Sequence, residues 1–136
     1  MEFDYQKPPS VVAVHTGFRS DRTTQLESVS FSAEGLSILV GSEHWKAKII
    51  FEQSYGFRVL DELDLTEFWT QCSLVDGWFF EVMDGGWKTL ELSRPHFLSG
   101  RNEWVREYLV IGLNECVSVL TKESPLIYAV AGPLPD

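Results

Sequence analysis

The chain has 136 residues, a length typical of one domain, and 44% of them are apolar, which is enough to form a hydrophobic core. Its 20 acidic residues outnumber 11 Lys and Arg, so the formal net charge is −9. This charge disfavours binding to nucleic acid or to an anionic membrane and allows a basic partner protein, although acidity also serves solubility alone.

The first ten residues, MEFDYQKPPS, lack the basic segment followed by an apolar segment that marks a secretory signal. The longest strongly apolar run, residues 108–113, is far shorter than the roughly 20 residues that cross a bilayer. We therefore expect a cytoplasmic protein with no membrane association. It should form a single domain over residues 1–136, with loose ends at 1–10 and 132–136.

Most of the chain alternates apolar and polar residues with the period of two that is typical of β-strands. Turn residues separate these segments, and an apolar segment over residues 126–130 lies near the end. The expected strands are residues 11–14, 26–33, 36–40, 45–52, 57–62, 78–83, 87–92, 104–111 and 115–121.

The stretch from Trp45 to Cys72 carries the one helix that the pattern predicts, over residues 64–72. Asp64 can accept hydrogen bonds from the first helical turn, and Glu67 can complete a capping box three residues later. One apolar stripe follows at the spacing i, i+3, i+4, i+7, formed by Leu65, Phe68, Trp69 and Cys72. Such a short helix needs to dock on a sheet to be stable.

A hairpin is expected around Asp84, Gly85 and Gly86, because this sequence is a strong turn signal between two aromatic and aliphatic runs, 78–83 and 87–92. The long connection that follows, residues 93–103, contains Pro, Gly and Asn and is predicted to be a loop.

Eight or nine short strands, one short helix at about 64–72 and closely spaced turns predict a mainly β protein. Its expected architecture is an antiparallel sandwich or a partly closed barrel. The alternative is an α+β arrangement in which one curved antiparallel sheet holds the helix against one face.

No metal, cofactor or catalytic motif is present. His15, His44 and His96 are scattered, and no cysteine lies at metal-ligand spacing from another ligand. Cys72 and Cys116 are 44 positions apart inside a helix-like and a strand-like segment, which favours free buried thiols. Because no phosphate-binding glycine motif occurs either, no cofactor is expected.

The segment 61–91 contains eight acidic residues and one base, Lys88, and so contributes −7 of the net charge of −9. If one surface binds a basic protein, it should lie here. The candidate partner-binding residues are Asp61, Glu62, Asp76, Glu81 and Asp84. A capping role for Asp64 and Glu67, and a solvated surface for the others, is the competing interpretation.

A second candidate site would bind a small molecule. The loop 93–103 carries a cationic cluster that can recognise a carboxylate or phosphate, and tryptophans near it can line an apolar cavity. The candidate ligand-binding residues are Arg94, His96, Arg101, Trp78, Trp87 and Trp104. Intramolecular ion pairs and ordinary core packing are the competing interpretations.

The run GFRVLDELDLTEFW, residues 56–69, resembles stretches in uncharacterised bacterial proteins. In size, acidity and β content the whole chain resembles small bacterial proteins of the immunity or antitoxin kind, and this resemblance implies the neutralisation of a basic toxin. The first hypothesis is therefore a non-enzymatic interaction protein with an acidic binding face. A β-barrel or sandwich with an aromatic-lined cavity, and an enzyme without a recognisable motif, are the alternatives. A homodimer formed through strand edges or sheet faces is also compatible with the pattern.

Overall fold

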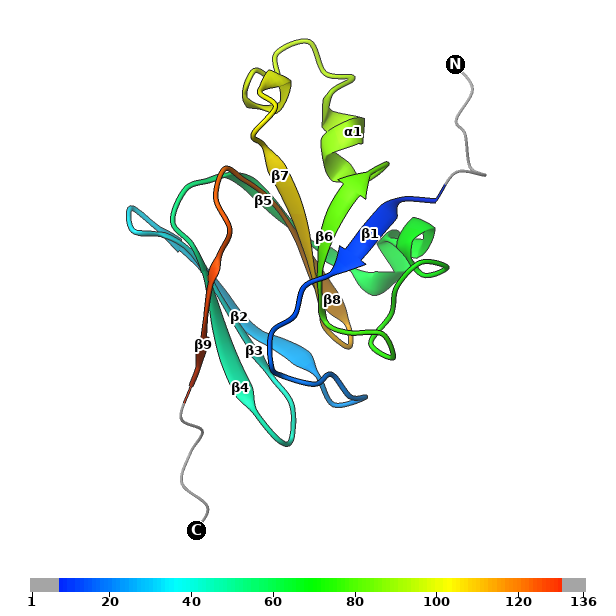
Figure 1. Ribbon diagram of the computed structural model, residues 1–136, viewed down its shortest axis with the longest axis vertical. Helices are drawn as coiled ribbons and strands as arrows, with labels where there is room; N and C mark the ends of the chain where they lie inside the picture. The colour runs from blue at the N-terminus through cyan, green and yellow to red at the C-terminus, as the bar shows by residue number, and fades with distance from the viewer. Residues whose placement is uncertain (1–7, 131–136) are drawn as a thin grey trace.

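The computed structural model describes residues 8–130, which form two antiparallel sheets of five and four strands packed face to face (Figure 1). The predicted mainly β antiparallel sandwich is confirmed. The strands form two sheets rather than the one curved sheet of the alternative, and neither sheet is closed into a barrel. Of the ends expected to be loose, Ser10 already belongs to the first strand, while residues 1–7 and 132–136 lie outside the described part.

The five-stranded sheet has the order β1-β6-β7-β8-β5, and the four-stranded sheet has the order β2-β3-β4-β9. The strands of the first sheet are β1 (Ser10–Ala13), β6 (Phe79–Asp84), β7 (Arg106–Ile111), β8 (Glu115–Thr121) and β5 (Ser54–Asp61). Those of the second are β2 (Gln25–Ser32), β3 (Gly35–Gly41), β4 (Lys46–Phe51) and β9 (Leu126–Ala129).

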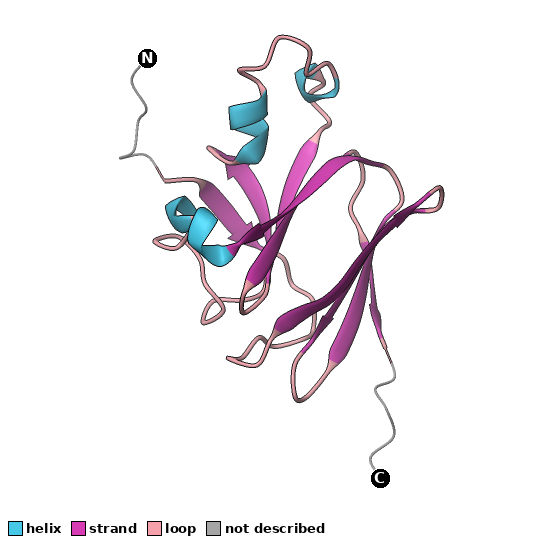
Figure 2. Cartoon of the chain, turned by 180° about the vertical axis from the view of Figure 1, so that it is seen from behind, coloured by secondary structure: helices cyan, strands magenta, loops and turns pink. Residues whose placement is uncertain are grey.

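Four short helical elements complete the described chain. They are the 3-10 helices η1 (Glu62–Asp64), η2 (Thr66–Phe68) and η3 (Ser99–Arg101) and the α-helix α1 (Trp87–Glu91). The pair η1 and η2 lies beside the five-stranded sheet, on the side away from the four-stranded sheet, while α1 and η3 lie past the ends of β6 and β7 (Figure 1, Figure 2). The five-stranded sheet is therefore the middle layer of the molecule.

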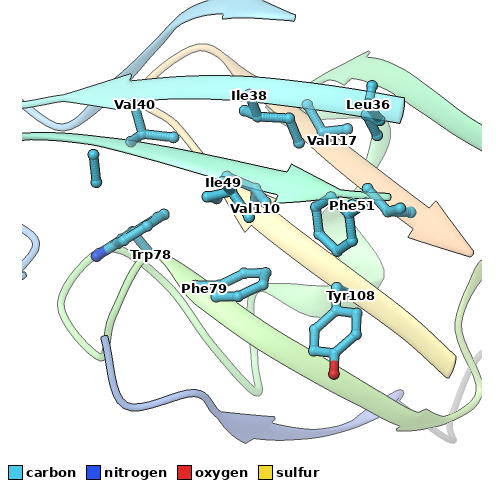
Figure 3. Packing of buried hydrophobic residues seen from close by; sticks show 12 residues of the cluster. Leu36, Ile38, Val40, Ile49, Phe51, Trp78, Phe79, Tyr108, Val110 and Val117 are labelled. Carbon is cyan, nitrogen blue, oxygen red and sulfur yellow. The ribbon is translucent and has the colours of Figure 1, made fainter. Parts of the chain in front are cut away.

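The main core fills the space between the two sheets (Figure 3). Alternate residues of β3 and β4 point into it because one face of each strand is apolar. They meet alternate residues of β7 and β8, together with Trp78 and Phe79. The buried residues of this core are Leu36, Ile38, Val40, Ala47, Ile49, Phe51, Trp78, Phe79, Tyr108, Val110, Val117 and Val119.

The other face of the five-stranded sheet is also buried. Leu109, Ile111 and Cys116 on this outer face pack against Leu65 and Phe68. A smaller cluster near α1 and η3 consists of Phe97, Val105 and Leu120, with Trp87 against it. Strands β7 and β8 are therefore apolar on both faces, as strands in the middle of a three-layer arrangement must be.

The helix expected over residues 64–72 consists of 3-10 turns and begins earlier than predicted. The carboxylate of Asp61, rather than Asp64, caps the first turn by accepting a hydrogen bond from the backbone N–H of Leu63 at 2.9 Å. Leu65 then leaves the helical conformation, with φ −128° and ψ 31°, and separates η1 from η2. The predicted apolar stripe is nevertheless correct, because Leu65, Phe68 and Cys72 are all buried.

The hairpin predicted around Asp84, Gly85 and Gly86 is wrong in its second arm. Residues after Gly86 form α1 instead of a strand. The reason is a carboxylate from another strand: Glu107 accepts hydrogen bonds from the backbone N–H groups of Trp87 and Lys88 at 2.9 and 2.8 Å. These groups lie in the first turn of α1, where no partner exists within the helix.

Candidate functional site

The end of the five-stranded sheet at which β5 stops and β8 starts gathers acidic side chains. Asp61 is the register partner of Glu115 on the neighbouring strand, so their side chains project from adjacent backbones. The backbone N–H of Glu62 donates to the carbonyl of Asn114 at 2.9 Å and holds the start of η1 beside the β7–β8 turn. Asp64 follows two residues later in η1.

Asp76 joins this group from the turn that precedes β6. The two cysteines, which are free and buried as predicted, belong to the same buried cluster on the outer face of the five-stranded sheet. Burial, together with the smaller effect of the negative charges of Glu62, Asp61 and Glu115, raises the pKa of the Cys116 thiol to about 11. Burial and the charge of Asp76 raise the pKa of the Cys72 thiol to about 12.

We call this group, Asp61, Glu62, Asp64, Asp76 and Glu115, the acidic end. All five residues are exposed. Among residues 8–130, none of the five forms an ion pair with a Lys, Arg or His side chain. Their negative charge is therefore left to solvent or to a partner.

Two apolar side chains stand out of the acidic end. Leu63 is 73% exposed and Val75 is 94% exposed, whereas Leu65 and Phe68 of the same stretch are buried. Exposed apolar side chains that are surrounded by charged side chains are typical of protein-binding surfaces. In the part of the chain that the structure describes, no three His, Cys, Asp or Glu side chains converge tightly enough to hold a metal ion.

The structure separates the predicted partner-binding residues into two groups. Asp61, Glu62 and Asp76 lie at the acidic end. Glu81 lies on β6, where its carboxylate forms a two-point ion pair with the guanidinium of Arg106, with both N–O distances 3.0 Å. Asp84 ends β6 near α1, at the opposite end of that strand from the turn that carries Asp76.

Sequence reasoning missed two members of the acidic end. Glu115 lies outside the acidic segment 61–91 and joins the group through the pairing of β5 with β8. Asp64 has the predicted role of a helix cap, which Asp61 fills instead. The sequence does contain a signal that places Glu115 at an end of the sheet. A residue that directly follows a hairpin turn starts a strand, and strands start at the ends of a sheet.

The predicted cationic loop is held by contacts within the chain. The Arg94 Nε donates to Glu91 at 2.7 Å, and the Arg101 guanidinium donates to the carbonyl of Pro95 at 3.2 Å. His96 is exposed. Arg94 also lies over the ring of Phe97, 5.7 Å from its centroid.

The three predicted tryptophans lie in different environments. Trp78 is 2% exposed in the main core, where its indole N–H donates to the carbonyl of Phe18 at 2.8 Å. Trp87 lies in α1, beyond the other end of β6. Trp104 is 53% exposed and donates to the hydroxyl of Tyr55 at 3.2 Å. The structure therefore does not bring these three rings together as one lining.

A surface depression of about 390 Å³ lies elsewhere, between the loop that precedes β2 and the turn that follows β3. Its lining includes Arg22, Glu27 and Glu43 and none of the six predicted ligand-binding residues. Glu27 is already paired with Lys46 at 3.2 Å.

A buried charged group near α1 was not foreseen. Glu107 is 2% exposed, and burial raises the pKa of its carboxyl against the opposing effect of the two backbone hydrogen bonds. The guanidinium of Arg58 lies 5.1 Å from the ring centroid of Trp87. Burial lowers the pKa of Arg58, and the charges of Glu107, Glu67 and Glu91 oppose this shift. Glu107, Arg58 and Trp87 together join the five-stranded sheet to α1, and we interpret their role as structural.

Between residues 8 and 130 no helix combines the length and the apolar character that a bilayer span requires. Comparison of the chain with protein-family models, curated proteins and solved structures gave no match in any of the three. The function is therefore inferred from the residues of this chain.

Proposed function

We propose that this chain is a non-enzymatic interaction protein that binds a basic partner protein through the acidic end. The observation that carries the proposal is the set of exposed carboxylates around Leu63 and Val75 that have no cationic partner within residues 8–130. These carboxylates raise the local negative potential and would steer a positively charged protein toward this end.

Exposed surface charges contribute little affinity singly, so the apolar residues are needed as anchors. Leu63 and Val75 lie among the carboxylates and would be covered by a partner, which gives apolar burial with charge pairs around it. A basic toxin is the partner class that fits the resemblance to bacterial immunity proteins.

The first experiment identifies the partner by its contact. A photo-crosslinking amino acid is placed at Leu63 in the full chain and expressed in the native host. The control places the same amino acid at Lys48, which is exposed on the outer side of the four-stranded sheet. We expect one basic protein to crosslink from position 63 and not from position 48.

The second experiment tests the charges with the purified partner. The variant E62Q/D64N/E115Q removes three carboxylates that form no side-chain hydrogen bond or ion pair among residues 8–130. The matched control E34Q/E52Q/E123Q removes three exposed carboxylates elsewhere. We expect a loss of affinity of about tenfold for the first variant, with a weaker dependence on salt, and little change for the control.

Equal effects of the two triple variants would mean that net charge, and not the acidic end, governs binding. A crosslinked partner with an acidic surface, or no crosslink at position 63, would overturn the proposal.

A further inference from the structure

The depression between the loop that precedes β2 and the turn that follows β3 is lined by two opposite charges that do not pair. Arg22 belongs to the loop and Glu43 to the turn, and both line the space of about 390 Å³. Among residues 8–130 neither side chain forms a hydrogen bond or an ion pair, with the other or with any third group. A guanidinium and a carboxylate that border one space without meeting can each bind an opposite charge of the same ligand.

Thr23 joins the two walls that carry these charges. Its hydroxyl accepts a hydrogen bond from the backbone N–H of Glu43 at 3.0 Å and donates one to the carboxylate of Asp21. The same carboxylate accepts from the backbone N–H of Thr23 at 2.7 Å. The loop and the turn are therefore fixed to each other, and Asp21 is engaged within its own loop.

The third charged group of the lining, Glu27, already has a partner. Its carboxylate pairs with the ammonium of Lys46 at 3.2 Å. It lies close to Gly41, where a Cβ would be only 2.8 Å from the Glu27 Oε1. Arg22 and Glu43 are therefore the two lining charges that a ligand can answer, and their sum is zero. A ligand with a single charge would leave one of them without a partner.

Leu113 gives the lining an apolar part. It is 43% exposed in the turn between β7 and β8, and it lines the depression together with Gln25 at the start of β2. The backbone N–H of Gly112 donates to the carbonyl of Glu115 at 3.0 Å and closes this turn. A ligand that covers Leu113 would remove apolar surface from water in addition to meeting the two charges.

We infer that the depression binds a free α-amino acid with an aliphatic side chain. The ligand carboxylate accepts hydrogen bonds from the guanidinium of Arg22, the ligand ammonium donates to the carboxylate of Glu43, and the aliphatic side chain packs on Leu113. The volume of the depression lies within the range of roughly 300–1,000 Å³ that is typical of small-molecule sites.

The charge of the whole chain favours such a dipolar ligand over an anion. The formal net charge of −9 repels anions, whereas a zwitterion has no net charge and is not repelled. Ion pairs between exposed groups contribute only weakly to binding. We therefore expect a Kd of about 1–10 mM.

The test titrates the isotope-labelled full chain with L-leucine at neutral pH and follows the backbone amide signals by NMR. Saturable shifts should occur at residues 22–27, 41–43 and 113 and not in β1 or α1. Two probes with the same carbon skeleton separate the charges, because isocaproate lacks the amino group and isopentylamine lacks the carboxylate. Each probe should bind about fivefold more weakly than leucine.

Two single variants assign each ligand charge to its residue. R22Q should lose the preference for leucine over isopentylamine, because the carboxylate then has no partner. E43Q should lose the preference for leucine over isocaproate. The controls R19Q and E34Q remove exposed charges outside the lining and should keep both preferences. A change in net charge alone cannot produce this pattern, because each variant should affect the recognition of only one ligand charge.

Shifts that do not saturate, or that lie outside the lining, would overturn the inference. Equal affinity of the wild type for leucine and for either single-charge probe would show that the depression does not recognise a zwitterion. Unchanged preferences in R22Q or E43Q would contradict the assigned contacts. The inference does not depend on the proposed function, because its test contains no partner protein.

Discussion

The carboxylate of Glu107 on β7 accepts a hydrogen bond from the backbone N–H of Trp87, 20 residues earlier in the chain, and a second one from Lys88. This contact fixes the start of α1 on the outer face of the five-stranded sheet. In its absence two N–H groups of the first helical turn would lose their acceptor. A buried donor without a partner costs about 1–3 kcal/mol.

We therefore expect E107A to lower the free energy of unfolding by about 2–3 kcal/mol, measured by urea denaturation. The control is E103A, because Glu103 is an exposed acid in the loop just before β7. It should change stability by less than about 0.5 kcal/mol. Faster hydrogen exchange at the amides of Trp87 and Lys88 in E107A would assign the loss to α1. Equal stability of E107A and wild type would show that the contact does not hold the helix.

Glu107 should also make stability depend on pH. Burial raises the pKa of its carboxyl above the ordinary value of 4.5, so the folded state binds this proton more tightly than the unfolded state does. Below pH 4.5 the group is protonated in both states. As the pH rises through the raised pKa, the ionised form penalises the folded state and stability falls.

The measurement is the difference in free energy of unfolding between wild type and E107Q at several pH values. Other carboxyl groups titrate in both proteins and cancel in this difference. We expect the advantage of the wild type over E107Q to decrease from about pH 4.5 toward neutrality. An advantage that grows with pH would mean that the backbone N–H groups and Arg58 outweigh the cost of burial.

The sequence predicts those strands of the sandwich whose apolar pattern lies within a short stretch of residues. Leu36, Ile38 and Val40 alternate with less buried residues along β3, and this period is sufficient to assign a strand with one face in the core. The helix α1 is different, because the acceptor for its first N–H groups comes from Glu107 on another strand. Since no local pattern contains that contact, the two glycines before Trp87 favoured a hairpin turn.

The acidic end was predictable in part for the same reason. Asp61 and Glu62 are neighbours in the sequence, and a count of charges identifies them directly. Glu115 reaches them through strand pairing over more than 50 residues, which depends on the register of β5 and β8. Glu81 belongs to the same acidic segment, but its pairing with Arg106 depends on the packing of β6 against β7.

The two cysteines should be unreactive in the folded protein. The pKa of Cys72 is raised to about 12 and that of Cys116 to about 11, chiefly by burial. At pH 8 roughly one thiol in a thousand or fewer is then ionised, and the thiolate is the reactive form. We expect no fast reaction with a thiol-specific disulfide reagent in buffer, and two thiols per chain in about 8 M urea.

An engineered control gives the labelling rate of an exposed thiol. S30C places a thiol at an exposed position of β2 and should react at once in the folded protein, with one equivalent per chain. Rapid labelling of folded wild type would show that the core around the cysteines opens, contrary to their burial.

Substitutions at two glycines with positive φ allow the cost of backbone strain to be compared with the cost of steric contact. A Cβ at Gly35, where φ is +119°, would lie 2.5 Å from the carbonyl oxygen of Phe51 on the neighbouring strand. A Cβ at Gly17, where φ is +82°, would meet no atom within 4 Å. G17A should therefore cost about 1 kcal/mol from backbone strain, and G35A at least about 3 kcal/mol, because β3 must also move away from β4. Urea denaturation of the two variants measures both costs, and equal values would show that the β2–β3 turn yields without disturbing the sheet.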